Sequence, residues 1–326
     1  MTPSLRAGRL PGFEYRRVRC NGVTLNVALA GDGPPVLLLH GWPQSHVMWH
    51  GIAPPLARHH AVVCADLRGY GDSSKPRGLP DHSNYSKRVI ALDMVELMGR
   101  LGHERFHLVG HDRGARVAHR LARDHGERVA SLTVIDIAPT LAMYERTDMA
   151  FARAYYHWFL FIQPPPLPER MIEAVGLVGM LGRLAATTGA AGGVFTREAL
   201  REYVRCYDRR TIHASCEDYR AAAGIDLEHD RADVEAGRLL DLPLHVIWGS
   251  RGVVGRMFDP LAEWRKVARR VSGAALPAGH FVPEERPRET LAEIRRFLAA
   301  QAASIAPAAK PAPTRRRVHS GPLQRP

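Results

Sequence analysis

The chain has 326 residues, 45% of them hydrophobic, which is enough for one large α/β domain with an insertion or for two modest domains. Its net charge is +12, of which residues 301–326 supply +5, leaving 12 − 5 = +7 spread over the remainder without interleaved aromatic residues, so the composition argues against nucleic-acid binding. With no run of 18 apolar residues and no hydrophobic signal segment at the start, we expect a soluble, unexported, cytoplasmic protein that does not bind a membrane.

Strand and helix patterns alternate through the first half of the chain. Strands are expected at 23–29, 34–41, 60–69, 105–110 and 129–139. Residues 86–101 place apolar side chains on one face at helical spacing, with Ser86 as the expected N-cap. A second helix is expected over 115–126, closed by Gly126.

The alternation breaks after Pro139 and returns near residue 239. A strand is expected at 242–250, a helix at 259–271, a short strand near 273–280 and a helix at 286–300. The pattern predicts an α/β fold with a mostly parallel central sheet and helices on both faces. The core domain would comprise residues 1–139 and 239–303, with a helical cap at 140–238. Residues 304–326, basic and rich in Pro and Ala, predict a disordered tail.

The segment HLVGHDRGAR, residues 107–116, places a carboxylate between a strand and a helix. Its pattern G-x-D-x-G suits a tight strand–turn–helix, because Gly110 and Gly114 relieve crowding and Asp112 projects above the sheet. A carboxylate ionises near pH ~4 without help. It can therefore displace a leaving group from saturated carbon and form an alkyl ester. Asp112 is the predicted nucleophile.

Hydrolysis of such an ester needs a general base and an acid that holds the base in place. His280, after the last predicted strand, stands where such a fold places its histidine. The segment after the strand at 242–250 offers no carboxylate at the expected point, so Asp136 in TVIDIAP is the predicted partner of His280. The alternative for Asp136 is a loop-capping residue.

Backbone amides are expected to stabilise the oxyanion of ester hydrolysis. The predicted donors are the N–H groups of Trp42, in the segment HGWP, and of Arg113, directly after the nucleophile. The alternative for HGWP is a simple turn around Pro43. The segment DLRGYGDSS, residues 66–74, is interpreted as a structural loop.

Seven motifs carry a resemblance that covers nearly all of residues 12–300. They are HGWP, ADLRGYGDSSKP, GHDRGAR, VIDIAP, ARAYYHW, CEDYR and GHF. In this combination the chain resembles the α/β-hydrolase superfamily and, within it, the fluoroacetate (haloacetate) dehalogenases. The resemblance implies Asp112 as nucleophile, His280 as base and Asp136 as its partner, and it implies a homodimer.

Two arginines distinguish the turn after Asp112 from the same turn in related enzymes. In the haloalkane dehalogenases and epoxide hydrolases a tryptophan usually follows the nucleophile, whereas Arg113 follows it here and Arg116 comes one helical turn later. Two guanidinium groups can clamp a substrate carboxylate through charge-assisted hydrogen bonds. The alternative, surface arginines at a helix start, is disfavoured because a helix N-terminus repels cations.

The resemblance also implies a halide site in the cap. His157, Trp158 and Tyr219 match the halide-binding set of the family and offer an imidazole N–H, an indole N–H and a phenol O–H. Each residue alone would more often be a packing residue. Near Leu184 some relatives carry a tryptophan, so its absence leaves the accepted substrate size open.

The main hypothesis is hydrolytic dehalogenation of a short 2-haloacid, with fluoroacetate as the leading candidate and glycolate as product. This reaction takes a small anionic substrate and needs no metal or organic cofactor. The first alternative is an epoxide hydrolase with the same nucleophile, in which two cap tyrosines would donate to the epoxide oxygen. The available tyrosines besides Tyr219 are Tyr155, Tyr156, Tyr203 and Tyr207. The arginine pair disfavours such a neutral substrate. A non-catalytic carboxylate binder and nucleic-acid binding by the tail are the remaining alternatives, and the preference between fluoro- and chloroacetate stays open.

The cysteines give no sign of a metal site or a disulfide framework. Cys20, Cys64, Cys206 and Cys216 form no CxxC pair, and their spacing is not typical of metal ligands. Free thiols in a reducing compartment are expected.

Overall fold

The computed structural model describes residue 5, residues 8–187 and residues 193–301. In this part of the chain, eight strands form one sheet in the order β1-β2-β4-β3-β5-β6-β7-β8. The strands are β1 (Glu14–Cys20), β2 (Val23–Ala30), β3 (Pro35–Leu39), β4 (Ala61–Ala65), β5 (Phe106–His111), β6 (Val129–Ile135), β7 (Leu240–Gly249) and β8 (Ala268–Leu276). Strand β2 pairs antiparallel with β1 and β4, and every other neighbouring pair in this sheet is parallel. The predicted α/β class is confirmed.

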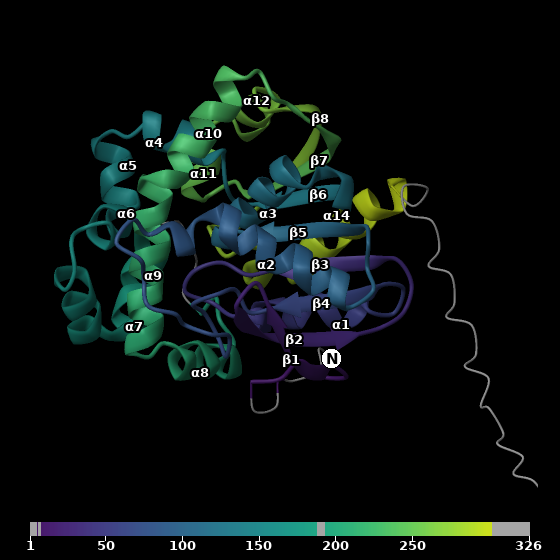
Figure 1. Ribbon diagram of the computed structural model, residues 1–326, viewed down its shortest axis with the longest axis horizontal. Coiled ribbons are helices and arrows are strands. Elements are labelled where there is room, and N and C mark those ends of the chain that lie inside the picture. The colour runs from purple at the N-terminus through teal and green to yellow at the C-terminus, as the bar shows by residue number, and fades with distance from the viewer. Residues whose placement is uncertain (1–4, 6–7, 188–192, 302–326) are drawn as a thin grey trace, which may run out of the picture.

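The central strands are buried along their whole length. Every residue of β3, β5 and β6 is buried, as expected for parallel strands covered on both faces. Figure 1 shows α2 (Lys87–Arg100) and α3 (Arg113–Asp124) in front of the strands. Ser86 caps α2 as predicted, since its side chain accepts a hydrogen bond from the N–H of Val89.

Other helices complete the core. They are α1 (Ala53–Leu56), α11 (Val253–Met257), α12 (Pro260–Arg265), α13 (Val282–Glu285) and α14 (Pro287–Ala300), with short 3₁₀ helices η1 (His46–Gly51), η2 (Ser83–Tyr85) and η3 (Gly126–Arg128). Helix α14 is joined to the end of α1, because Arg295 Nη2 donates to the carbonyl of Pro55 at 2.5 Å.

Seven helices of the described residues lie between β6 and β7 in the chain, and we call them the cap helices. They are α4 (Thr140–Glu145), α5 (Met149–Ala154), α6 (Tyr156–Phe161), α7 (Leu167–Thr187), α8 (Arg197–Cys206), α9 (Arg209–Ala223) and α10 (Ile225–Glu235). In Figure 1, α4 to α9 gather beside the sheet, in the left half of the view. The predicted boundaries of core and cap stay predictions, and the predicted tail at 304–326 lies outside the described residues.

Two local predictions were wrong. The helix expected over 259–271 ends at Arg265, because Ala268–Leu276 forms β8 and pairs in parallel with β7. Gly126 does not close α3: the helix ends at Asp124, His125 occupies the C-cap, and Gly126 starts the turn η3. Strand β1 was not expected, because its sequence has no apolar run. Its polar residues fit its place at the edge of the sheet.

The described residues contain neither a candidate membrane span nor a candidate metal cluster. None of the helices in 8–187 and 193–301 is both long enough and apolar enough for a membrane span. Within the same ranges, no three histidine, cysteine or acidic side chains are arranged to hold a metal ion.

Candidate active site

Asp112 occupies a tight corner between β5 and α3. Its backbone has φ 44°, a left-handed conformation that few residues other than glycine adopt. The two flanking glycines have no room for a side chain. A Cβ on Gly110 would lie 2.6 Å from the Cα of Ala115, and one on Gly114 would lie 2.4 Å from the carbonyl oxygen of His40. The G-x-D-x-G pattern is therefore required by backbone packing.

The carboxylate of Asp112 is buried and faces hydrogen-bond donors. The backbone N–H of Trp42 donates to Oδ2 of Asp112 at 3.1 Å. Burial opposes ionisation of Asp112, but the positive groups around it, His280 and the two arginines among them, outweigh burial and hold its pKa below the usual value. Asp112 is therefore an anion at neutral pH. Arg113 starts α3, so its own amide is one of those that a helix leaves without an internal partner.

The predicted base and its predicted partner are hydrogen bonded. Nδ1 of His280 lies 2.6 Å from Oδ2 of Asp136, and the other carboxylate oxygen of Asp136 accepts from the N–H of Gly249 at 3.0 Å. Burial alone would lower the pKa of His280, but Asp136 outweighs burial, and the pKa is raised. This arrangement fixes the tautomer of His280 with Nε2 available for proton transfer.

The backbone on both sides of His280 is fixed by Glu285, which the sequence did not single out. Its carboxylate accepts from the N–H of Gly279 at 2.8 Å and from the N–H of Phe281 at 3.1 Å. Nε2 of His111 donates to the carbonyl oxygen of His280 at 2.9 Å. Burial lowers the pKa of His111 to about 3, so its imidazole is neutral. The loop that carries His280 is thus held independently of the Asp136 contact.

Both predicted clamp arginines are buried, and each has one nitrogen without a hydrogen-bond partner among the described residues. Arg113 donates through Nε to Oδ2 of Asp218 at 2.7 Å and through Nη2 to the carbonyl of Asp218 at 2.8 Å, which leaves Nη1. Arg116 donates through Nη1 to Oγ1 of Thr140 at 2.8 Å and through Nη2 to Sδ of Met143 at 3.2 Å, which leaves Nε. Buried unpaired donors are costly and need an explanation, and a ligand supplies one.

Comparisons with known proteins identify the family. The family model described as "alpha/beta hydrolase fold" matches residues 34–164. A protein from Burkholderia sp named fluoroacetate dehalogenase is 48% identical over 88% of this chain and 94% of its own length. The chain belongs to the fluoroacetate dehalogenase family of α/β hydrolases.

Two further matches place this family among its neighbours. A soluble epoxide hydrolase from Corynebacterium sp. (strain C12) is 32% identical over 88% of the chain and 98% of its own length. A solved structure from Nostoc sp PCC 7120, described as an alpha/beta hydrolase, has a TM-score of 0.86 at 53% identity, covering 89% of this chain and 99% of that one. The resemblance stated from the motifs is confirmed.

The halide-binding set expected for a fluoroacetate dehalogenase lies against the arginines. The guanidinium of Arg113 stacks on the ring of Tyr219 at 4.1 Å, and that of Arg116 stacks on Trp158 at 4.8 Å. The ring centroids of His157 and Tyr219 are 5.8 Å apart. The structure therefore brings the three residues of the set together beside the clamp.

His157 is the most informative member of this set. Burial lowers its pKa to about 3, so the ring is neutral and one of its nitrogens carries a hydrogen. Its Nδ1 is buried and has no partner among the described residues. The ring stacks on Trp42 with centroids 5.1 Å apart. His157 is thus held in place by Trp42 of the segment HGWP.

The other cap residues considered in the sequence have different neighbours. The hydroxyl of Tyr203 donates to Oε1 of Glu284 at 3.0 Å, and the hydroxyl of Tyr207 accepts from the indole N–H of Trp42 at 3.0 Å. Tyr155 lies near the base, with its ring centroid 6.4 Å from that of His280. Leu184 is buried in α7.

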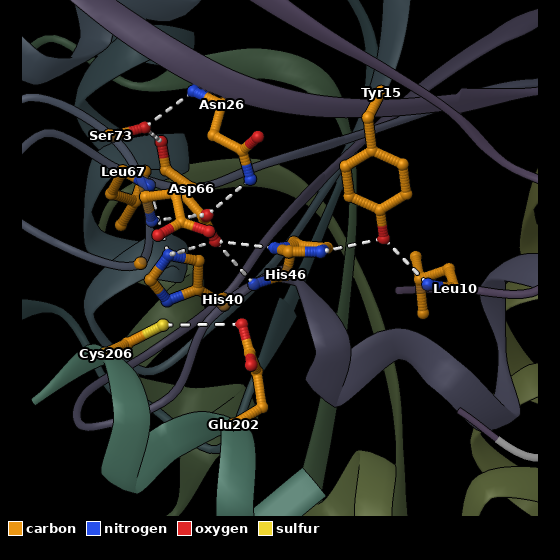
Figure 2. A network of polar contacts seen from close by, with 12 residues as sticks. Leu10, Tyr15, Asn26, His40, His46, Asp66, Leu67, Ser73, Glu202 and Cys206 are labelled. Carbon is orange, nitrogen blue, oxygen red and sulfur yellow. Dashed lines mark hydrogen bonds and ion pairs between the residues drawn. The ribbon is translucent and has the colours of Figure 1, made fainter. Parts of the chain in front are cut away.

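Figure 2 shows the polar network that fixes the segment HGWP. Nδ1 of His40 donates to the carbonyl of Gly41 at 3.0 Å, so its Nε2 accepts from the N–H of Leu67 at 3.0 Å. Asp66 accepts from the backbone N–H of His46 at 2.8 Å and from Nδ1 of the same residue at 2.9 Å. The loop 66–74, interpreted as structural, therefore anchors the chain on both sides of Trp42.

Four residues of the site were not predicted from the sequence: Asp218, Glu285, Thr140 and Met143. Asp218 lies in the motif CEDYR beside the predicted Tyr219, so the motif itself could have drawn attention to it. Glu285 carried no comparable signal. Cys20, Cys64, Cys206 and Cys216 are free and buried, as expected for thiols, and the reducing compartment stays a prediction.

Proposed function

We propose that the chain is a hydrolytic dehalogenase of short 2-haloacids, with fluoroacetate as the leading substrate. The observation that carries the proposal is the pair of buried, unpartnered nitrogens, Nη1 of Arg113 and Nε of Arg116, directly after an ionised Asp112. Two such donors suit the two oxygens of a substrate carboxylate. The match to a protein named fluoroacetate dehalogenase supports the same substrate class.

The first step is a nucleophilic displacement. With the substrate carboxylate on the arginines, an oxygen of Asp112 attacks the α-carbon, the carbon–halogen bond breaks, and the halide leaves with the bonding electrons. His157, Trp158 and Tyr219 are the proposed donors to the departing halide. The side chains of His157 and Tyr219 remain neutral, because burial lowers the pKa of the imidazole and raises that of the phenol.

The second step is hydrolysis of the resulting ester. His280 removes a proton from water, whose oxygen attacks the carbonyl carbon of the Asp112 ester, and Asp136 stabilises the imidazolium. The N–H groups of Trp42 and Arg113 are the proposed oxyanion donors. Collapse returns the proton to the departing alkoxide and gives glycolate. The released Asp112 then ionises, so each turnover consumes one water and yields one halide and one proton.

The test of the proposed function is halide release coupled to a covalent adduct. Purified protein is incubated with fluoroacetate, and free fluoride is read with an electrode. Asp112→Asn should release none, whereas His280→Asn should release about one fluoride per molecule and retain a carboxymethyl group that peptide mass mapping locates on residue 112. A single turnover in ¹⁸O-labelled water should leave label in Asp112. Normal folding and substrate binding without an adduct in His280→Asn would contradict the mechanism.

An epoxide hydrolase is the runner-up because a Corynebacterium protein of that name is 32% identical. A neutral epoxide leaves the two free arginine nitrogens unpaired. The hydroxyls of Tyr203 and Tyr207 are already bonded to Glu284 and Trp42. Parallel assays of halide release and styrene oxide hydrolysis distinguish the two activities, and stoichiometric carboxylate binding without turnover would indicate a non-catalytic binder.

The setting of the enzyme is also a proposal. The four free cysteines fit a reducing cytoplasm. We propose a homodimer that uses no metal or organic cofactor and binds neither nucleic acid nor membrane. Size-exclusion chromatography with light scattering tests the oligomeric state, and full activity after dialysis against a chelator tests independence from metal.

A further inference from the structure

The two clamp arginines differ in how their charge is balanced. Arg113 forms an ion pair with Asp218 on α9, in which both side chains expose only 1% of their surface. The same carboxylate oxygen accepts from the hydroxyl of Tyr70 at 2.9 Å, and the other one contacts Nζ of Lys87. Lys87 in turn lies 3.5 Å from a carboxylate oxygen of Asp226. The positive charge of Arg113 is thus part of a buried, balanced network.

Arg116 has no such network. Its hydrogen-bond acceptors among the described residues are a hydroxyl and a thioether, from Thr140 and Met143, and both are neutral. Its other contact is the face of Trp158. Of the groups that raise the pKa of Arg116, Asp112 has the largest effect, against the lowering effects of burial and Arg113. Within the described part of the chain, Arg116 is therefore a buried cation without a carboxylate that forms an ion pair with it.

We propose that the arginines divide their tasks: Arg116 supplies the net charge that selects an anionic substrate, while Asp218 acts as a positioning residue that neutralises Arg113 and orients it. This inference rests on the proposed function. Asp218 holds two edges of the Arg113 guanidinium, through its side chain and through its own carbonyl, so only Nη1 is left for the substrate. Arg113 then fixes the direction of a hydrogen bond to the substrate carboxylate, and Arg116 supplies the net positive charge that attracts it.

The charge of Arg116 is also used after displacement. Once Asp112 has become an ester it carries no charge, but the carboxylate of the former substrate remains attached beside the clamp. Arg116 pairs with this carboxylate in the intermediate, whereas before substrate binds its charge acts on the ionised Asp112 without an ion pair. A carboxylate paired with Arg116 would cancel that attraction. Burial of the substrate carboxylate would then be costly, because no unpaired cation would offset its charge.

The test compares an acid with a neutral analogue that has the same carbon–halogen bond. Chloroacetate and chloroacetamide are assayed for chloride release, and kcat and KM are determined for the wild type, Arg116→Gln and Asp218→Asn. Arg116→Gln should lose about 10²-fold in kcat/KM for chloroacetate and less than ~3-fold for chloroacetamide, mainly through KM. Asp218→Asn should lower kcat about 10-fold or more for both substrates, since a misplaced positioning group slows the reaction. It should keep the preference for the acid.

A matched control removes another buried carboxylate that pairs with an arginine of α3, without touching the clamp. Asp233 on α10 pairs with Arg120, which lies on α3 one turn beyond Arg116. Asp233→Asn should leave the acid-to-amide ratio unchanged. If Arg116→Gln keeps that ratio, or if Asp218→Asn reduces it as much as Arg116→Gln does, the division of tasks is wrong.

Two measurements keep the inference testable where a variant is unstable or turnover is absent. Asp218→Glu keeps the charge and should retain the acid preference with a smaller loss of kcat than Asp218→Asn. Calorimetric binding of acetate and acetamide reports the same charge selection without chemistry. Absence of halide release by the wild type would reject the proposed function alone, whereas equal acetate binding by wild type and Arg116→Gln would reject this inference alone.

Discussion

Gly41 lies so close to Asp112 that any side chain at position 41 would overlap the side chain of Asp112, the proposed nucleophile. A Cβ atom there would be 2.6 Å from the Cβ of Asp112 and 3.0 Å from its Oδ2. The residue before Trp42, the proposed oxyanion donor, is therefore limited by the position of the Asp112 carboxylate, and the two motifs HGWP and GHDRG constrain each other.

The first prediction concerns this contact. Gly41→Ala should displace Asp112 and lower kcat by about 10²-fold, since a shift of about 1 Å has that effect on a reacting group. It should also lower the free energy of unfolding by about 1–3 kcal/mol through overpacking. Fluoride release and urea unfolding measure the two effects. Gly126→Ala is the control, because a Cβ on Gly126 meets nothing within 4 Å. Wild-type activity in Gly41→Ala would contradict the prediction.

The second prediction separates the two chemical steps. Asp136→Asn removes the acceptor that fixes the tautomer of His280, and such a change lowers kcat by about 10⁴-fold in a comparable triad. Displacement by Asp112 does not use the base, so a single burst of fluoride should persist while the ester accumulates. Rapid-quench measurement of fluoride together with intact mass tests this. A burst lost in proportion to kcat would show that Asp136 acts on displacement as well.

The third prediction is a shift in pH dependence. His280 must be neutral to accept a proton, so kcat should fall as the pH drops below its raised pKa. Asp136 is the main group that raises this pKa against burial, and Glu285 adds to the effect. Glu285→Gln should therefore move the acid limb of the kcat profile to lower pH, even if kcat itself falls. Glu293→Gln, a substitution in α14, is the control. An unmoved limb would mean that Glu285 is only structural.

The fourth prediction concerns acid stability. Burial opposes ionisation of Asp66, but His46 outweighs burial and lowers the pKa of Asp66. Its stabilising effect is therefore present above the unfolded pKa near ~4 and is lost as the pH falls further. Asp66→Asn should lower the free energy of unfolding by about 3–5 kcal/mol at neutral pH, because it breaks a buried charge network. It should also flatten the acid limb of Tm against pH, as measured by calorimetry, and an equally steep limb would contradict this assignment.

Residues that follow predicted strands were the easiest to anticipate. Asp112 follows β5 and Asp136 follows β6, and both strands are mostly apolar, so a local pattern placed them. The parallel sheet then brings their ends to the same edge. The helix expected over 259–271 was wrong for the converse reason, since pairing with β7 overrode the local helical pattern from Ala268 onward.

Residues whose role depends on docking of the cap could not be anticipated in the same way. Arg113 and Asp218 are 105 positions apart, and their contact exists only because α9 lies against the start of α3. No local periodicity encodes that arrangement. The motif CEDYR marked the helix as important through its resemblance, but the partner of Asp218 required coordinates.

The closed arrangement of the site has a kinetic consequence. Asp112, His157 and His280 each expose at most 5% of their surface. We therefore expect ligands to reach them by movement of the cap helices away from the core, which would break bridges such as Trp42 to Tyr207 and Tyr203 to Glu284. Each cycle requires two such openings, one to admit the haloacid and one to discharge halide and glycolate. The rate of cap opening thus limits kcat, and this upper limit should fall as solvent viscosity rises.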